Sequence, residues 1–473
     1  MDFITSSERP VFGSHIRGTT LDNITSRCYL FYNSEASEKT YELSRQVEKL
    51  DLFLSHSWSG SPFWKHMTLV TVLYVKFGYI AMLLTVIPLS VGIYFLPAYK
   101  REAVVATEVL GVFAMFLGMW FGYLVPSRTN KKMVFLDKCC IPQVDEEAKR
   151  EGLKNMEAYL SRSDTLLILW TPEYFSRLWC VFELASYLRS HGPDSILCLS
   201  AWFMRSYHMV VWWEVACVIS LETANAAIPR DPQIKLWIAL VCWSVTEVAL
   251  CIAICLIVIL FCIPAKMELK KQVQQFSMRT AYCTLAEDTT MLSSRISEWY
   301  GSNESFDECV RSSWSRVNSV MKIPEPALSR PGIAFVTFPY VMALWPRLLT
   351  ALAWNYRSEE NGYSWTVIIR STFIMFVLLA CRTPLFVVMS YRIGSAVWLK
   401  GSLAKCISIA IMVFFALLYG GAMFVSAQGV LILYGPQTPI LFAQSPWAWL
   451  FIALPILAVA LVCWTHFPRG LHH

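Results

Sequence analysis

The stretch Leu50-Asp51-Leu52-Phe53-Leu54-Ser55 decides the fold class, because its apolar run is typical of a buried strand. It leads into a polar loop that begins at His56 and Ser57. Similar apolar runs follow, and regions with helical spacing of apolar residues separate them. These runs occupy residues 133–137, 165–170 and 196–199. Strands that alternate with helices predict a parallel sheet covered on both faces.

Thr171-Pro172 predicts the start of a helix after the third strand, since threonine is a common N-cap and proline is favoured at the first helical position. The apolar pattern extends this helix to about residue 190. Side chains three or four residues apart share one helix face. We therefore expect one face to carry Ser176, Trp179, Cys180 and Glu183.

Long apolar blocks separate this chain from an ordinary soluble protein. Of its 473 residues, 56% are hydrophobic and only 16% are charged, whereas a soluble domain has about one quarter charged residues. Residues 78–96 and 103–125 are each long enough to cross the ~30 Å hydrocarbon core of a bilayer. The short link between them predicts a transmembrane hairpin inside the α/β domain.

Six further spans are predicted. Residues 236–263 form a clear span, and residues 204–228 form a weak one because Glu214 and Glu222 are costly to bury in lipid. If residues 204–228 form a surface helix instead, the total is seven spans rather than eight. The last four predicted spans lie near residues 332–354, 364–390, 404–434 and 446–465.

The distribution of charge predicts orientation and excludes two classes of ligand. Basic residues flank the predicted spans on one side, so the soluble parts and both termini are expected in the cytosol. The net charge of +6 forms no basic stripe, which argues against a nucleic-acid partner. The 15 cysteines show no metal-ligand spacing, so no metal site is predicted.

These patterns divide the chain into eight parts. A polar segment precedes the α/β domain, whose two parts flank the hairpin, and a cytosolic helical segment separates the later spans. The predicted parts are residues 1–48 (polar segment), 49–76 (first part of the α/β domain), 77–126 (hairpin), 127–203 (second part), 204–263 (two spans), 264–330 (cytosolic helical segment), 331–466 (four spans) and 467–473 (cytosolic tail).

Three pieces of the α/β domain resemble the TIR (Toll/interleukin-1 receptor) domain superfamily. They are Asp51-Leu52-Phe53-Leu54-Ser55, Val134-Phe135-Leu136-Asp137, and the Tyr174–Leu184 region containing Trp179-Cys180 and Glu183. The third resembles Y-x-x-S-x-x-W-C-x-x-E-L with a shift of one position at the serine. The resemblance covers less than a fifth of the chain. The chain is also similar to multi-pass membrane proteins of unicellular eukaryotes that carry such a domain. It implies a flavodoxin-like parallel sheet.

The resemblance also implies a site. In catalytic members the glutamate of W-C-x-x-E contacts the nicotinamide ribose of NAD, which gives Glu183 the catalytic role. NAD is then a substrate, and no permanently bound cofactor is expected. The predicted ligand-contacting residues are Ser55, His56, Ser57, Asp137, Ser176, Trp179 and Cys180. Purely structural roles stay open as alternatives: Trp179 as core packing, Cys180 as an inert buried thiol and Glu183 as a surface ion-pair partner.

The sequence therefore predicts a membrane-anchored TIR-like signalling protein. It acts by homotypic TIR–TIR association or by recruiting partners, and NAD glycohydrolase activity is one open possibility. A second interpretation is a non-catalytic adaptor. A third is a transporter or channel with a TIR-like regulatory domain. That interpretation rests on ionisable residues within predicted spans: Glu108, Glu247, Arg347, Arg370 and Arg382.

Overall fold

The computed structural model divides the chain into two units, which are described separately. The α/β unit comprises Met1–Leu73, Trp120–Met204 and Ala265–Met321. The helical unit comprises Tyr74–Met119, Arg205–Pro264 and Lys322–His473. The residues that the structure describes are 16–32, 37–95, 101–142, 146–227, 245–246, 248–283, 286–319, 386, 389–390, 392–398 and 405–417.

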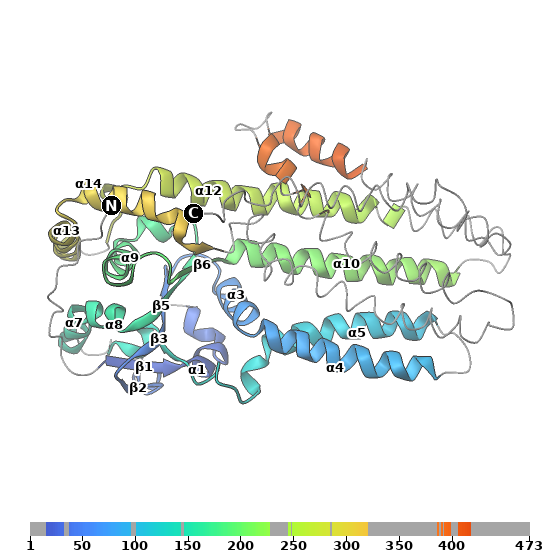
Figure 1. Cartoon of the computed structure of the whole chain (residues 1–473), viewed down its shortest axis with the longest axis horizontal. Helices are drawn as coiled ribbons and strands as arrows, with labels where there is room; N and C mark the ends of the chain where they lie inside the picture. Colours follow the sequence, from blue (N-terminus) through green and yellow to red (C-terminus); the bar gives the residue numbers. More distant parts are fainter. Residues whose placement is uncertain are drawn as a thin grey trace, which may run out of the picture. The chain divides into compact units, whose positions relative to one another are not determined.

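A seven-stranded sheet forms the centre of the α/β unit, in the order β2-β1-β4-β3-β5-β6-β7 (Figure 1). The five strands β4, β3, β5, β6 and β7 pair parallel with one another in that order, and β1 pairs antiparallel with both β2 and β4. Numbered along the chain, the parallel strands therefore lie in the order 2-1-3-4-5. The strands are β1 (Ile16–Thr20), β2 (Ser44–Val47), β3 (Leu50–His56), β4 (Met133–Phe135), β5 (Ser163–Trp170), β6 (Ile196–Ser200) and β7 (Asn318–Ser319).

The central strands are apolar because helices cover both faces of the sheet. In β5 every residue from Leu166 to Trp170 is buried. Phe53 of β3 stacks on Phe135 of β4, with ring centroids 4.3 Å apart. The predicted parallel strands at residues 50–55, 133–137, 165–170 and 196–199 are thus confirmed, with ends that differ by one or two residues.

Short helices connect these strands and cover the sheet. Strand β3 leads into α3 and β5 into α9, whereas α8 precedes β5. The helices of the α/β unit are α1 (Leu21–Thr25), η1 (Cys28–Phe31), α2 (Glu38–Tyr41), α3 (Pro62–Leu73), η2 (Gly122–Leu124), α6 (Asp137–Cys140), α7 (Glu146–Lys154), α8 (Met156–Ser161), η3 (Tyr174–Ser176), α9 (Leu178–His191), α12 (Ile263–Gln274), η5 (Met278–Thr280), α13 (Ala286–Tyr300), α14 (Asn303–Ser313) and η6 (Trp314–Arg316).

The N-terminal residues contribute more than the polar segment predicted for residues 1–48. From Ile16 onward they form β1, α1 and β2, which extend the sheet beyond β4. Ile16, Ile24 and Phe31 are buried in the core of the α/β unit. These apolar residues are too widely spaced to mark a helix or strand by periodicity, so the sequence pattern did not reveal them.

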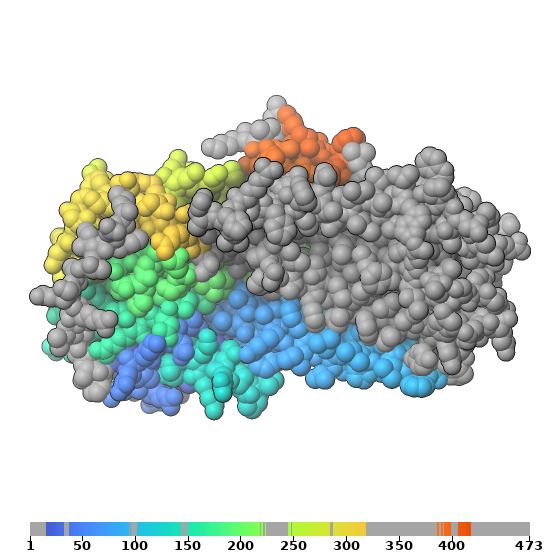
Figure 2. All heavy atoms as spheres, in the orientation of Figure 1, coloured from blue at the N-terminus to red at the C-terminus, as the bar shows by residue number. Residues whose placement is uncertain are grey.

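The division of the chain after Pro264 lies next to the predicted boundary, but the residues that follow do not form the separate helical segment predicted for 264–330. Residues 265–321 belong to the α/β unit and supply its fifth parallel strand, β7. Leu292 and Ile296 of α13, with Phe306 and Val310 of α14, are buried in the same core as β5. This returning segment, yellow in Figures 1 and 2, lies against α9. The α/β unit is therefore interrupted twice, after Leu73 and after Met204.

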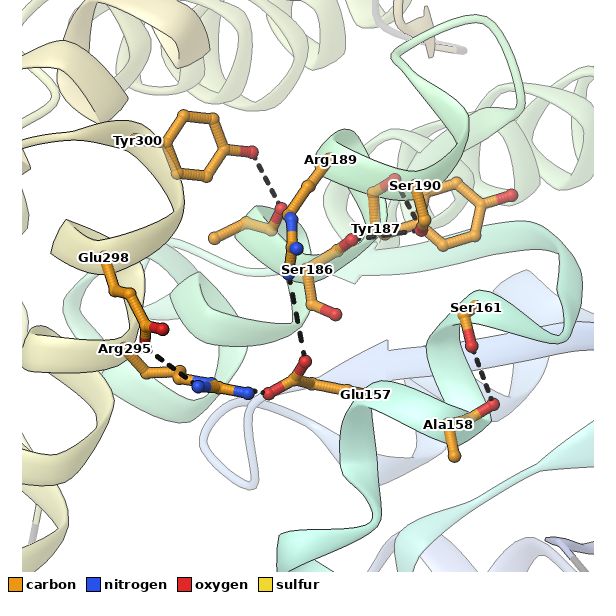
Figure 3. A network of polar contacts seen from close by, with 11 residues as sticks. Glu157, Ala158, Ser161, Ser186, Tyr187, Arg189, Ser190, Arg295, Glu298 and Tyr300 are labelled. Atoms are coloured by element: carbon orange, nitrogen blue, oxygen red, sulfur yellow. Dashed lines mark hydrogen bonds and ion pairs between the residues drawn. The ribbon is translucent and has the colours of Figure 1, made fainter. Parts of the chain in front are cut away.

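An ion-pair network centred on the half-buried Glu157 fastens the returning segment to the rest of the unit (Figure 3). The carboxylate of Glu157 on α8 accepts a hydrogen bond from Arg295 Nε of α13 at 2.9 Å, and Arg189 Nη1 of α9 lies 3.9 Å away. Both guanidinium groups also lie over the ring of Trp299. Tyr300 donates to the carbonyl oxygen of Ala185 at 2.8 Å. Glu157 thus joins three helices that the sequence places far apart.

We expect Glu157→Gln to weaken the docking of α13. The amide keeps the shape of the side chain but loses the charge that two guanidinium groups share, which costs about 1 kcal/mol of stability. Hydrogen exchange of peptides from α13 would detect this as faster local opening. Glu298→Gln is the matched control, because the Glu298 side chain is 66% exposed and pairs only with Arg295 among the described residues. Equal protection in both variants would contradict the fastening role.

The helical unit contains apolar helices. Three described helices are long and apolar enough to cross a membrane: Val75–Ile93, Glu102–Trp120 and Val248–Gln274. The first two match the predicted hairpin and form α4 (Val75–Tyr94) and α5 (Arg101–Trp120). The third contains the π-helical turn η4 (Val258–Cys262) and continues into α12. Its start lies within the predicted span 236–263, of which residues 236–244 and 247 are outside the described residues.

The weak span predicted at residues 204–228 forms part of α10 (Ala201–Ala227), which is not among those three helices. Of the four last predicted spans, only short pieces are described, including the apolar helix Lys405–Leu417. Predicted spans 332–354 and 446–465 and the tail 467–473 lie outside the described residues.

Candidate active site

The candidate site lies where β3, β4 and β5 end at their carboxyl edge. Strand β3 ends at His56 beside Leu169 of β5, and Phe53 of β3 pairs with Phe135 of β4. The residues that follow these strands therefore meet at one edge, which is where ligands bind in open parallel sheets. Ser57, Asp137 and Thr171 are the first polar residues beyond the three strands.

Glu183 of α9 is held at this edge by the hydroxyl group of Ser55, which Tyr174 supports in turn. Ser55 Oγ, in β3, donates to Glu183 Oε2 at 2.5 Å. The same Ser55 oxygen shares a hydrogen bond of 2.7 Å with Tyr174 Oη of η3. Ser55 and Tyr174 are buried, whereas Glu183 is half-buried. The hydrogen bond from Ser55 thus fixes the direction of the carboxyl group.

Burial raises the pKa of Glu183 to about 8. The hydrogen bond from Ser55 lowers this pKa, and the charge of Asp137 raises it further. Burial has the largest effect because the carboxylate loses more stabilisation from water than the single hydrogen bond from Ser55 restores. Near neutral pH, with no ligand bound, Glu183 is therefore largely a neutral acid. A cationic ligand would favour its ionised form.

This raised pKa predicts a pH dependence of stability. The folded protein holds a proton on Glu183 between pH 4.5 and about 8, whereas the unfolded chain does not, so this group makes stability fall as pH rises through that window. His56 acts oppositely below its ordinary pKa of 6.5, because burial lowers its pKa to about 3. We therefore expect wild type to lose stability relative to Glu183→Gln between pH 6.5 and 8. Thermal unfolding of both proteins across this range measures the difference, and parallel curves would contradict it.

Asp137 occupies the neighbouring strand end, at the first turn of α6. Its Oδ2 accepts a hydrogen bond from Trp58 Nε1 at 3.2 Å, and its Oδ1 accepts from the backbone N–H of Lys138 at 2.7 Å. Burial raises the pKa of Asp137, and these hydrogen bonds with the Lys138 charge lower it. Asp137 therefore positions the indole of Trp58 beside the site.

Ser57 and His56 point to different neighbours. Ser57 Oγ shares hydrogen bonds with Thr171 Oγ1 at 2.9 Å and with Ser59 Oγ at 2.8 Å. The ring of His56 packs edge-on against Phe31 and Trp58. Its Nε2 is buried and has no hydrogen-bond partner in the described part of the chain.

The expected helix from Thr171 to about residue 190 is in fact two elements. The 3-10 turn η3 ends at Ser176, Arg177 adopts an extended conformation, and α9 begins at Leu178. Ser176 is therefore not on the α9 face that carries Glu183, and its hydroxyl donates to Glu173 O at 2.8 Å. The backbone N–H of Tyr282 donates to Ser176 O, and this bond accompanies the extended conformation of Arg177.

The surroundings of Trp179 and Cys180 favour structural roles, as core packing and as an inert buried thiol, over contact with a ligand. Trp179 Nε1 donates to Asp288 Oδ2 of α13 at 3.2 Å, and its ring packs against Phe182. Cys180 is buried, and burial raises the pKa of its thiol well above its ordinary value. A thiol without a nearby activating cation in hydrogen-bond contact is unreactive. Glu183 is not a surface ion-pair partner, since no described cation pairs with it.

Three residues of the site were not predicted from the sequence: Tyr174, Thr171 and Lys65. Tyr174 stands in the third motif but gave no separate chemical signal. Thr171 was interpreted only as a helix N-cap. Lys65 is fully buried and its Nζ donates to Ser57 O at 2.5 Å. A single charged residue beside an apolar run is typical of a residue that flanks a membrane span. The sequence pattern therefore did not predict that Lys65 is buried.

Comparisons with known proteins add no relative: no protein-family model, curated protein or solved structure matches the chain. The argument for function therefore rests on the site itself.

Proposed function

We propose that this chain is a membrane-anchored TIR-like signalling protein whose cytosolic α/β unit hydrolyses the bond between nicotinamide and ribose in NAD. The observation that carries the proposal is the position of Glu183 at the carboxyl edge, where it accepts a hydrogen bond from Ser55 and Ser55 bonds to Tyr174. Signalling would follow from association of these units on the membrane or from recruitment of partners. The apolar helices would provide the anchor.

The order of strands supports the TIR-like assignment. Numbered along the chain, the parallel strands lie 2-1-3-4-5, which is the flavodoxin-like order. The three sequence pieces of the resemblance fall on β3, β4 and the η3–α9 region, and Glu183 lies near the start of α9. Ligands of flavodoxin-like sheets bind at the carboxyl edge near the first and third parallel strands, here β3 and β5.

The proposed reaction uses Glu183 as an electrostatic and orienting group. The bond between C1′ of the ribose and the pyridinium nitrogen breaks, and nicotinamide leaves with the electron pair as a neutral molecule. The ribose then carries oxocarbenium-like positive charge, which an adjacent carboxylate stabilises. Water adds to C1′ and loses a proton to the solvent. The positive pyridinium of bound NAD would lower the pKa of Glu183 and place it in the ionised form.

Ser55 and Tyr174 are positioning residues in this scheme. The Ser55 hydroxyl donates to one carboxylate oxygen, Oε2, and Tyr174 in turn holds the Ser55 hydroxyl in place. Because the hydrogen-bonded carboxylate does not need to reorient during the reaction, its charge is available as the positive charge develops.

The experiment is NAD turnover by the full-length protein. We would reconstitute it into liposomes at high surface density, since association of TIR-like units is part of the proposal, and quantify nicotinamide and ADP-ribose. Wild type is expected to release both in equal amounts, and Glu183→Ala is expected to release neither. Glu304→Ala is the control, because Glu304 is an exposed residue of α14 paired with Arg279. Absence of nicotinamide from wild type would overturn the catalytic proposal and favour the adaptor.

A further inference from the structure

Lys65 presents a buried positive charge that lacks a counter-ion. Its side chain in the first turns of α3 is fully buried, and Nζ donates to Ser57 O at 2.5 Å. Among the described residues, Nζ has no other hydrogen-bond acceptor and no carboxylate within ion-pair distance. A lysine is almost never fully buried unless it is paired. Its burial therefore calls for an explanation beyond packing.

Hydroxyl groups gather beside this ammonium. Ser57 Oγ bonds to both Thr171 Oγ1 and Ser59 Oγ. Gly60 adopts φ +85°, and a Cβ placed on it would lie 3.1 Å from Thr171 Cγ2 and 3.9 Å from Lys65 Cε. The loop backbone thus passes directly over Lys65 and Thr171, where only glycine fits without strain.

The loop that contains Gly60 leads directly into helix α3. Ser61 Oγ accepts a hydrogen bond from the backbone N–H of Trp64 at 3.5 Å, so Ser61 caps α3. The partial positive charge of a helix N-terminus adds to the ammonium. Ammonium, hydroxyl and backbone N–H groups together form the donor set that binds phosphate.

The residue before Ser57, His56, has a buried ring that packs against Phe31 and Trp58. His56 is buried next to Ser57, and its Nε2 has no partner within the described ranges. Burial and the nearby Lys65 charge lower the pKa of His56 to about 3, so the ring is neutral. A buried polar atom without a partner is uncommon in proteins.

We propose that Lys65, with the hydroxyls of Ser57 and Thr171, forms an anion subsite that takes a phosphate group of a nucleotide whose ribose lies at Glu183. This inference rests on the proposed function and names the part of the ligand beyond the ribose. Ser55 and Ser57 are two residues apart at the end of β3, about 7 Å along the chain. That spacing suits a ribose at the first and its attached phosphate at the second. The phosphate would replace Ser57 O as the partner of Lys65.

Glu173 offers a control substitution that should have the opposite effect on phosphate binding. Its side chain is exposed, and Oε2 accepts a hydrogen bond from Ser59 Oγ at 3.5 Å. Its negative charge raises the pKa of Lys65, while burial lowers that pKa to about 8. Since Glu173 repels an arriving anion, its neutralisation should strengthen phosphate binding where neutralisation of Lys65 weakens it.

The test measures binding of inorganic pyrophosphate and of ADP-ribose to the full-length protein in detergent by isothermal titration calorimetry. Lys65→Gln keeps a donor for Ser57 O and removes the charge, so its affinity for both probes should fall about tenfold or more. Glu173→Gln should bind pyrophosphate more tightly than wild type. Glu183→Gln should bind pyrophosphate as wild type does, because pyrophosphate has no ribose. Thermal unfolding of each variant confirms that it is folded.

Equal pyrophosphate affinity in wild type and Lys65→Gln would overturn the subsite, as would no binding by wild type. If pyrophosphate binds through Lys65 but NAD is not cleaved, the proposed hydrolysis fails and the subsite stands. If NAD is cleaved with the same KM by Lys65→Gln, the hydrolysis stands and the subsite fails.

Discussion

Replacing Trp170 by alanine is expected to lower the stability of the α/β unit by about 3–5 kcal/mol, because it removes a large side chain from a well-packed core. Trp170 is the last residue of β5 and is fully buried. Its Nε1 donates to Gln272 Oε1 of α12 at 3.2 Å, and Gln272 Nε2 donates to Pro172 O at 2.6 Å. The substitution therefore removes core volume and also loosens the contact between α12 and the residues that follow β5.

Hydrogen exchange of β5 peptides in the detergent-solubilised protein would measure this loss. A change of 3–5 kcal/mol corresponds to at least about a 100-fold loss of protection for amides that exchange by global opening. Tyr29→Ala is the control: Tyr29 is also aromatic but 53% exposed, so its removal should cost less than about 0.5 kcal/mol. Similar protection in the two variants would mean that β5 does not depend on its buried end.

The second large effect is expected in the hairpin of α4 and α5. A Cβ on Gly118 would lie 2.6 Å from Phe77 O and 2.9 Å from the Cα of Gly78. These are backbone atoms and cannot move aside, so the two helices approach closely only because both positions are glycine. Gly118→Val should therefore force the helices apart at a cost of about 3 kcal/mol.

Gly92→Val is the matched control, because nothing lies within 4 Å of a Cβ at that position of α4. Both proteins would be heated in detergent and the monodisperse fraction measured by size-exclusion chromatography. Gly118→Val should aggregate at a clearly lower temperature than wild type, and Gly92→Val should behave as wild type. Similar loss in both variants would indicate a general effect of valine, not close packing at Gly118.

The local pattern of the sequence was sufficient for the buried strands and the hairpin. Runs such as Leu166–Trp170 are apolar because helices cover both faces of the sheet, and α4 and α5 are long and mostly apolar. Periodicity reports this burial directly. The three motifs that contain Ser55, Asp137 and Glu183 were expected to meet at one edge of the sheet, and the role of Glu183 came from the resemblance to TIR domains.

The remaining features depend on contacts that no local pattern encodes. Strand β7 has two residues and pairs with β6 across more than 100 positions, so its membership in the sheet is decided by the packing of α13 and α14. The break at Arg177 separates Ser176 from α9 because Tyr282, far along the chain, bonds to its carbonyl oxygen. The burial of Lys65 is likewise visible only in the fold, where its Nζ donates to the loop carbonyl of Ser57.

The most direct test of the central claim is the rate constant for nicotinamide release by wild type and by Glu183→Gln at equal surface density. The amide has the shape of the protonated acid and retains an oxygen for Ser55, yet it cannot ionise. Since this variant is expected to be at least as stable as wild type above pH 6.5, unfolding would not account for lost activity. The account predicts a fall of about 100-fold or more in kcat. An unchanged kcat would contradict a catalytic role for the Glu183 carboxylate.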